Sequence, residues 1–166
     1  MAGALFRIDG GQPQAPFLGP LVPLFTLSQA NMNVTTDQPF LPTFNFDQFI
    51  LRAIRLFNSS TSLTTAAGAV YSAAAKGGVI LFSAAATTFA GATGVNNAGD
   101  EKTVVATGAG LFTTQAATAA KQAASALAFP GLFATQVAAP ILSLTTGQGG
   151  AATADLIIYG HAVTLY

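Results

Sequence analysis

The sequence predicts a mainly β fold: a jelly-roll-like sandwich over residues 46–166, preceded by an extended, Pro/Phe-rich N-terminal arm at residues 1–45. Three observations support this prediction. Short apolar segments recur along the chain, and turns of glycine, asparagine and serine separate them, as in antiparallel β domains. The arm holds six of the eight prolines. A length of 166 residues is enough for one domain with its own hydrophobic core.

The predicted arm combines proline with large apolar side chains. Spaced prolines interrupt helices and favour extended backbone. Phe17, Phe25 and Phe40 make the segment too apolar for a solvated linker. We therefore expect the arm to lie on a protein surface. The alternative is a disordered leader, because chain ends are commonly loose.

The first predicted strand of the sandwich is FDQFILRAIRLF, residues 46–57, with a short helix as the alternative because periodicity does not decide short apolar runs. Residues 58–61, NSST, end it with side chains that compete for backbone hydrogen bonds. SLTTAAGAVYSAA and KGGVILFSAAA, residues 62–74 and 76–86, follow as a predicted hairpin. Within it, residues 79–82 are expected to form a buried strand.

The middle of the chain has a different composition. Residues 89–102 form a polar turn, and KTVVATGAGLF at residues 102–112 predicts another strand. Residues 113–128, TTQAATAAKQAASALA, contain no glycine or proline and are rich in alanine, the best helix former. They predict a helical insertion of about four turns.

Two strands are predicted at the end of the chain, at residues 141–146 and 154–166, around the turn GQGGAATA. The tetrapeptide SLTT occurs twice, once before each of two glycine-containing turns. In both copies a leucine, Leu63 or Leu144, alternates with hydroxyl residues as in a half-buried strand. We therefore expect both copies to end a strand, with a structural role.

The low content of charged residues is the most unusual property of the composition. Only 7% of residues are charged, against about 25% in average domains. The net charge is zero, and exposed apolar area without net charge favours association, so we expect a homo-oligomer. Nucleic acid is not an expected partner, because binding it needs basic residues clustered on one face. The basic residues are instead scattered, at Arg7, Arg52, Arg55, Lys76, Lys102 and Lys121.

The sequence predicts no catalytic, cofactor-binding or metal-binding residue. Cysteine is absent, which excludes disulfides and thiolate metal sites. His161 stands alone, without the partners of a catalytic triad or a metal site. Asp100 and Glu101 are adjacent and are expected to be solvated, while Asp47 and Asp155 are expected to cap or pair locally.

Other patterns are interpreted as chance or as turns. Residues 147–152 match the G-x-G-x-x-A dinucleotide motif, but too few residues follow for the required βαβ unit, so a turn is expected. The glycosylation patterns at Asn33 and Asn58 have no consequence without export, and the N-terminus lacks the features of a secretory signal. Residues 122–154 carry no charge, yet prolines and glycines break the stretch, so no membrane span is expected.

Four motifs give the chain a resemblance to a known family. They are FILR at residues 49–52, SLTTAAG with a following tyrosine at residues 62–71, a KGG stretch at residues 74–78, and SLTT-x-QG-x-A-x-TAD before a hydrophobic YG strand at residues 143–160. In these motifs the chain resembles small tailed-phage virion structural proteins of the capsid decoration, or cement, type. The resemblance covers roughly residues 46–84 and 141–160, and does not extend to residues 89–136.

The resemblance implies a virion structural protein that decorates or cements a capsid as a jelly-roll oligomer, with no catalytic residues. We therefore expect a homotrimer on the capsid surface that binds the major capsid protein, with the arm of residues 1–45 lying across the shell. We expect no enzymatic activity, cofactor, nucleic acid or membrane partner. The alternatives are a tail, fibre or adaptor component of the virion, or a glycan-binding domain, since sugar sites need convergent polar groups in a concave surface.

Overall fold

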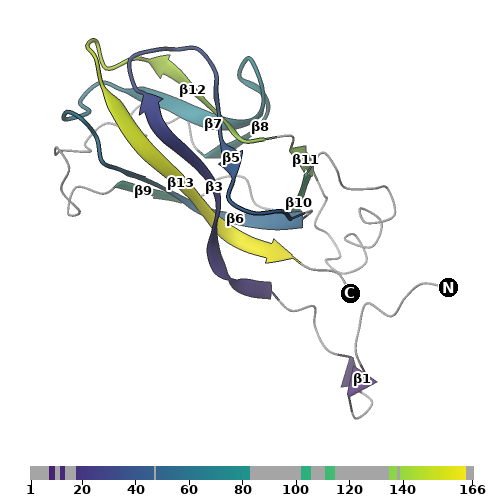
Figure 1. The fold of residues 1–166 in the computed structure, drawn as a ribbon. Helices are drawn as coiled ribbons and strands as arrows, with labels where there is room; N and C mark the ends of the chain where they lie inside the picture. The colour runs from purple at the N-terminus through teal and green to yellow at the C-terminus, as the bar shows by residue number, and fades with distance from the viewer. Residues whose placement is uncertain are drawn as a thin grey trace.

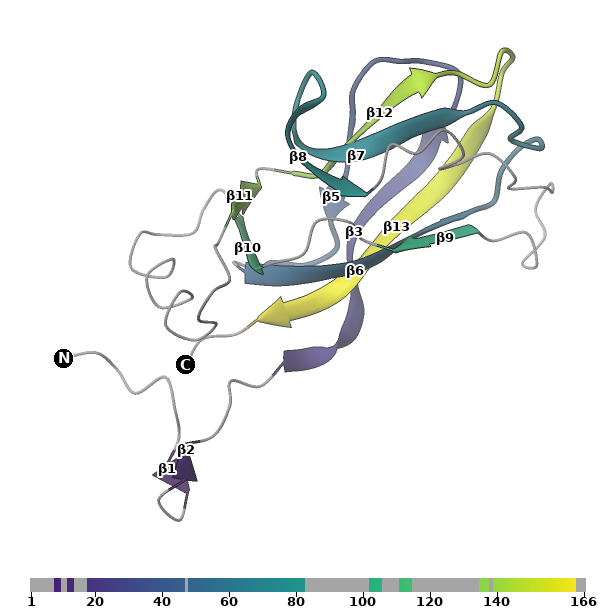
Figure 2. The same ribbon diagram turned by 180° about the vertical axis from the view of Figure 1, so that it is seen from behind.

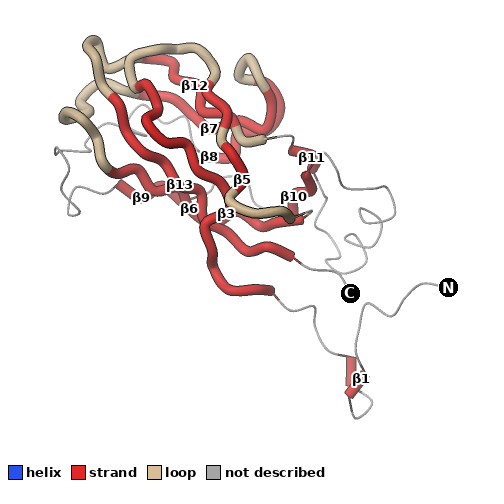
Figure 3. Tube along the Cα trace, viewed as in Figure 1, coloured by secondary structure: helices blue, strands red, loops and turns tan. Residues whose placement is uncertain are grey.

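The protein is described here by a computed structural model, which covers residues 8–9, 12–13, 18–46, 48–82, 102–105, 111–114, 135–137 and 139–163. Strands and loops make up all of this part of the chain (Figures 1 and 3). The predicted mainly β fold is confirmed. The strands are β1 (Ile8–Asp9), β2 (Gln12–Pro13), β3 (Leu18–Asn31), β4 (Gln38–Pro39), β5 (Leu41–Pro42), β6 (Gln48–Phe57), β7 (Ala67–Ala73), β8 (Gly77–Phe82), β9 (Lys102–Val105), β10 (Leu111–Thr114), β11 (Thr135–Val137), β12 (Ile141–Thr146) and β13 (Thr153–Val163).

The described strands form two main sheets and one short pair. The large sheet has the order β11-β10-β6-β13-β3-β5. Strand β9 also pairs with β6, at residues 53–56, whereas β10 pairs with residues 48–50 of the same strand. The small sheet has the order β4-β12-β7-β8, and β1 pairs with β2. All of these pairs are antiparallel except β10 with β11. The two main sheets lie in two layers (Figures 1 and 2).

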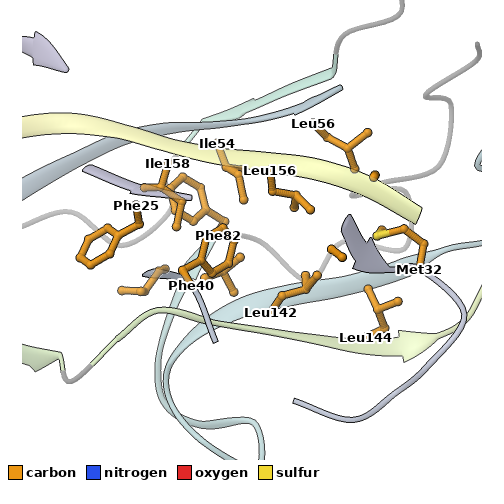
Figure 4. Packing of buried hydrophobic residues seen from close by; sticks show 14 of the residues in the cluster. Phe25, Met32, Phe40, Ile54, Leu56, Phe82, Leu142, Leu144, Leu156 and Ile158 are labelled. Atoms are coloured by element: carbon orange, nitrogen blue, oxygen red, sulfur yellow. The ribbon is translucent and has the colours of Figure 1, made fainter. Parts of the chain in front are cut away.

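The hydrophobic core lies between the two layers (Figure 4). On β13, alternate residues Ala154, Leu156 and Ile158 are buried, as expected for a strand with one face on a core. The small sheet contributes Leu142 and Leu144 from β12. Each large side chain removed from water in this way stabilises the fold by roughly 1.5–3 kcal/mol. The other large buried side chains are Leu24, Phe25, Met32, Phe40, Phe49, Leu51, Ile54, Leu56, Leu63, Val70, Leu81 and Phe82.

Strand β3 is long and irregular, and it shows how a proline-rich segment enters a sheet. Its pairing with β13 shifts register three times. Pro20 and Pro23 lie at or next to these shifts, where a missing N–H is tolerated. The extra residue Leu24 points into the core above Gly160 of β13. A Cβ on Gly160 would lie 2.6 Å from Leu24 Cδ1 and would also collide with the carbonyl oxygen of Ile50, so glycine is required there.

The predicted boundary between arm and sandwich is wrong for residues 18–45. These residues form β3, β4 and β5, which pair within the two main sheets. Phe25, Met32 and Phe40 are part of the core. The prediction of extended backbone was right, but the surface on which residues 18–45 lie belongs to the same chain. Of residues 1–17, the structure describes only the β1–β2 pair.

Most predicted strands of the sandwich are confirmed. They correspond to β6, β7, β8, β12 and β13. The expected buried strand at residues 79–82 is half wrong, because Leu81 and Phe82 are buried but Val79 and Ile80 are 42% and 43% exposed. These two residues lie in β8, at the end of the small sheet's strand order, where no second described strand covers them.

The predictions for the middle of the chain are only partly covered by the described residues. The single strand expected at residues 102–112 is two strands, β9 and β10, which pair with different halves of β6. Thr113 and Thr114 of the predicted helix belong to β10, and residues 115–128 lie outside the described residues. The polar turn expected at residues 89–102 also lies outside them, apart from Lys102 in β9.

Candidate functional site

The outer face of the large sheet carries a row of apolar side chains from neighbouring strands. Residues directly opposite each other in antiparallel strands point to the same side of a sheet. Tyr159 on β13 lies opposite Ala53 on β6 and Pro23 on β3, and its side chain points away from the core. The same register places further residues on this side. We call this surface the open face. Thr26, Arg55 and His161 lie on it, and its apolar members are Leu21, Pro23, Leu41, Ile50, Ala53, Ile157 and Tyr159.

The open face is accessible to solvent. Leu21 is 56% exposed and Leu41 is 66% exposed, and these are the two most exposed large hydrophobic side chains among the described residues. Phe44, just beyond β5, is 42% exposed. Exposed apolar side chains gathered on one face of a sheet indicate an interaction site more often than isolated ones do.

Charges on and beside the open face are few. Arg55 places its Cζ atom 5.9 Å from the ring centroid of Tyr159, a cation–π arrangement. Asp155 accepts hydrogen bonds from the Gln29 amide at 2.8 Å and from Asn58 Nδ2 at 2.9 Å. Asp155 is thus held by residues 126 and 97 positions away in the sequence, and not by the local cap or pair that the sequence suggested. These charges are held by neighbouring groups of the same chain, which leaves apolar contact as the main interaction that the open face offers.

His161 has a structural environment. It lies on β13 opposite Leu21 and Ile50. Its Nδ1 donates to the carbonyl oxygen of Gly19 at 2.7 Å, which ties the beginning of β3 to β13. The arrangement fits the sequence interpretation of a structural histidine. Asp47, Asp100 and Glu101 lie outside the described residues. Within the described ranges, no group of three or more His, Cys, Asp or Glu side chains could hold a metal ion.

The outer face of the small sheet differs, because several of its residues are buried. Val70, Leu142 and Leu144 belong to the core, so the alternate residues of β7 and β12 point outward. Four of these outward residues are buried although none of the four belongs to the core cluster, whereas Thr145 on β12 and Ile80, opposite Tyr71 on β8, are exposed. We call this surface the covered face, and it comprises Ala67, Ala69, Tyr71 and Ser143.

The tip of the β7–β8 hairpin curls up at the end of β7 (Figure 2). Leu142 pairs with Gln38, and continuing this register places Asp37 beside Ser143. Asp37 Oδ2 accepts a hydrogen bond of 2.6 Å from the amide of Ala75 at the hairpin tip. This amide lowers the pKa of Asp37 below its ordinary value, and the nearby Ser143 hydroxyl and the charge of Lys76 act in the same direction. The tip is thereby held above β12.

Gln148 joins the two SLTT segments at one end of the sandwich. Its Oε1 accepts hydrogen bonds from the amides of Thr64 and Thr65 at 2.9 and 3.2 Å. Its Nε2 donates to the carbonyl oxygen of Ser62 and to Thr64 Oγ1, both at 3.1 Å. The Gln148 amide donates to the carbonyl oxygen of Met32 at 2.8 Å. One side chain therefore fixes the loop before β7 against the turn between β12 and β13.

The structure corrects the interpretation of the repeated tetrapeptide. The copy at residues 143–146 ends β12, as expected. The copy at residues 62–65 lies in the loop before β7, so it precedes a strand and does not end one. Residues 147–152 form a turn, as predicted, in which the Gly149 amide donates to Asn33 Oδ1 at 2.8 Å. Two of the four motifs behind the family resemblance thus meet through Gln148.

Sequence reasoning missed the residues that organise both ends of the small sheet. Asp37 and Gln148 make contacts across 38 and more than 80 residues of sequence, and no local pattern indicates such pairs. The open face could have been found from the alternation of Ile157, Tyr159 and His161, if the strand had been paired with β3.

In the described part of the chain, no helix is long and apolar enough to cross a membrane.

Comparisons with known proteins do not assign the chain to a family. No protein-family model matches the sequence, and no curated protein or solved structure is detectably similar to it.

Proposed function

We propose that the protein is a structural subunit of a virion, a capsid decoration or cement protein, built on a jelly-roll-like sandwich. In this proposal it assembles as a homotrimer and binds the major capsid protein on the outside of the shell. It has no enzymatic activity and uses no cofactor, metal, nucleic acid or membrane. The single observation that carries the proposal is the open face, with Leu21 and Leu41 more than half exposed.

The chemistry of the open face suits permanent assembly. Obligate interfaces resemble a domain core cut in half and bury 2,000 Å² or more. The apolar side chains of the open face match the hydrophobic character of such interfaces. The whole chain is also poor in charge, with only 7% charged residues. Identical subunits close readily into point groups. A trimer suits the local threefold positions of a capsid.

The proposed role differs from the sequence expectation in which surface makes the contact. Residues 18–45 are built into the sandwich, so they cannot all lie across the shell as a separate arm. We assign the contact instead to the open face, which includes Leu21 and Leu41 from this segment. Deleting residues 1–40 would remove β3 and β4 and unfold the protein, and therefore cannot test shell binding.

The test uses empty shells assembled from the major capsid protein of the phage that carries this sequence. Purified protein is mixed with the shells, sedimented and imaged by cryo-electron microscopy. We expect trimeric density at local threefold positions. The double variant Leu21→Lys, Leu41→Lys should lose at least tenfold in affinity, because each lysine must be desolvated at the interface. Gly150→Lys is the matched control, since a side chain there meets nothing within 4 Å.

Three outcomes would contradict the proposal. The first is no binding of the wild-type protein to intact shells. The second is density confined to a tail, fibre or adaptor, which would support the alternative location in the virion. The third is equal loss of binding in the double variant and the Gly150→Lys control, which would remove the open face as the contact.

A further inference from the structure

The tip of the β7–β8 hairpin has a backbone conformation that its residues disfavour. Ala75 and Lys76 have φ angles of 56° and 59°. The Gly77 amide donates to the carbonyl oxygen of Ala74 at 3.0 Å, which closes a four-residue turn with positive φ at both central positions, as in a type I′ turn. Such turns favour asparagine and glycine. Here the chain has alanine and lysine, so the turn itself opposes the closed conformation.

The next residues of the hairpin are fitted closely. Gly78 has a φ of 71°, and a Cβ there would collide with Ser72 Oγ. That hydroxyl accepts a hydrogen bond from the Val79 amide at 2.8 Å. The register between β7 and β8 shifts twice within this region. The hairpin is therefore bent where it leaves β7, and the bend directs its tip back toward β4.

One contact outside the hairpin holds the tip in place among the described residues. The Ala75 amide, at the first of the disfavoured positions, donates to Asp37 Oδ2 at 2.6 Å. Charge-assisted hydrogen bonds of this length are stronger than neutral ones. The segment that carries Asp37 is itself anchored, because Gln38 Oε1 accepts from the Asn31 amide at 2.7 Å and Gln38 Nε2 donates to the Asn31 carbonyl oxygen at 2.9 Å.

We propose that residues 73–78 form a strap that Asp37 latches closed at the end of β7, with its tip held beside β12, and that the strap opens locally while the sandwich stays folded. The strained turn favours opening, and the Asp37–Ala75 hydrogen bond favours closing. Opening would leave Tyr71 and Ser143, which are now buried, accessible from outside. The strap is a conformational device that is separate from the open face and independent of the proposed capsid role.

The test is amide hydrogen exchange of the full-length protein at pH 7, followed by mass spectrometry. In Asp37→Ala, exchange in residues 73–79 should become at least tenfold faster, while exchange in β6 and β13 stays unchanged. Asp37→Asn keeps an acceptor oxygen and should fall between wild type and Asp37→Ala. Ala75→Gly removes strain at a positive φ while it keeps the amide that donates to Asp37 and the charge of Lys76, so it should slow the exchange. The double variant Asp37→Ala, Ala75→Gly should lie between the two single variants.

A pH series gives a second readout with a defined sign. The pKa of Asp37 is lowered from its ordinary value, so the latch holds at neutral pH and is lost as pH falls through that lowered pKa. Lys76 is the charged group that faces Asp37, and Ser143 on β12 contributes only a hydroxyl. After correction for intrinsic exchange, the strap of the wild type should open as the pH falls below the ordinary pKa of aspartate, whereas Asp37→Ala should show no such step.

Two results would overturn the strap. If Asp37→Ala speeds exchange equally in the strap and in β6, Asp37 stabilises the whole sandwich and is no latch. If it changes exchange nowhere, the contact does not hold the tip. Nitration of Tyr71, located by peptide mass mapping, provides an independent measure: it should rise in Asp37→Ala and fall in Ala75→Gly.

Discussion

The outer faces of the two sheets differ in how their apolar residues are removed from water. On the small sheet, Ala69 is fully buried and Tyr71 is 7% exposed, although both point away from the core, and Asp37 holds the β7–β8 hairpin tip at one end of this sheet. Ile80, opposite Tyr71, is 43% exposed. On the large sheet, Leu21 and Leu41 remain more than half exposed. The first face is covered within one chain. The open face is also rich in apolar residues, but no described residues of the chain cover Leu21 and Leu41. We therefore assign the open face to assembly with other subunits.

Side-chain size accounts for part of this difference. The covered face consists of alanine, serine and one tyrosine, so a short hairpin tip can approach the sheet closely. The open face carries larger side chains, with leucine, isoleucine, proline and tyrosine beside Thr26, Arg55 and His161. A second protein is better suited than a six-residue turn to fill such a surface.

The largest expected effect comes from placing a charge on each face. Ala69→Glu buries a carboxylate without a partner, which costs roughly 3–5 kcal/mol and should prevent folding. Ala53→Glu, on the open face, should fold normally and weaken self-association. Circular dichroism and thermal melting report folding, and light scattering reports association. A folded Ala69→Glu protein with the wild-type melting temperature would show that the covered face is not covered.

A matched pair of tyrosines should give the next largest effect. Tyr71→Ala removes a buried ring and should lower the free energy of unfolding by about 3 kcal/mol. Tyr159→Ala removes a partly exposed ring and should cost the monomer less than about 1 kcal/mol. Urea denaturation of dilute protein, where assembly does not contribute, measures both. Equal losses would mean that the two faces are equally buried in the single chain.

The Gln148 side chain tests whether the loops at the end of the two sheets act as one unit. Gln148→Ala leaves the amides of Thr64 and Thr65 without their acceptor and should cost roughly 1–3 kcal/mol. Gln148→Glu keeps the acceptor oxygen but loses the bond to the Ser62 carbonyl, so an intermediate loss is expected. Thermal denaturation gives the comparison. A glutamate variant less stable than the alanine variant would contradict this account.

The smallest expected effect is at Ser143. Its Oγ is buried and lies near Asp37 without a hydrogen bond in range. Ser143→Ala should therefore change the free energy of unfolding at pH 7 by no more than about 0.5 kcal/mol, since removing an unsatisfied polar group is close to neutral. A loss above about 1 kcal/mol in urea denaturation would show that the hydroxyl is bonded, and would add it to the latch.

The sequence predicts the strands where local pattern and packing agree. FILRAIRLF and ADLIIYGHAV have the apolar character of β6 and β13, and NSST ends β6 with Asn58 at a φ of 50°. The sequence does not predict the strands within residues 18–45. Prolines there indicate that helices are interrupted, but they do not show whether the segment pairs with a distant strand. Register shifts at Pro20 and Pro23 let β3 join the sheet, and these shifts depend on β13, more than 120 residues away.

The candidate surfaces were less predictable than the strands. Low charge predicts association but does not say which face associates, because the exposure of Leu21 and Leu41 depends on pairing across the sheet. The hairpin tip beside the covered face is held by a hydrogen bond from the backbone amide of Ala75 to Asp37. Every residue except proline has such an amide, so the residue type at position 75 does not indicate this contact. The expectation of a subunit from a capsid surface remains a proposal.

The molecular mass in solution tests the central claim most directly. Multi-angle light scattering of the wild-type protein at neutral pH should give about three times the chain mass of 16.7 kDa. The variant Leu21→Lys, Leu41→Lys should give the mass of one chain while keeping its β spectrum. A wild-type protein that stays monomeric at high concentration would contradict the assignment of the open face to assembly.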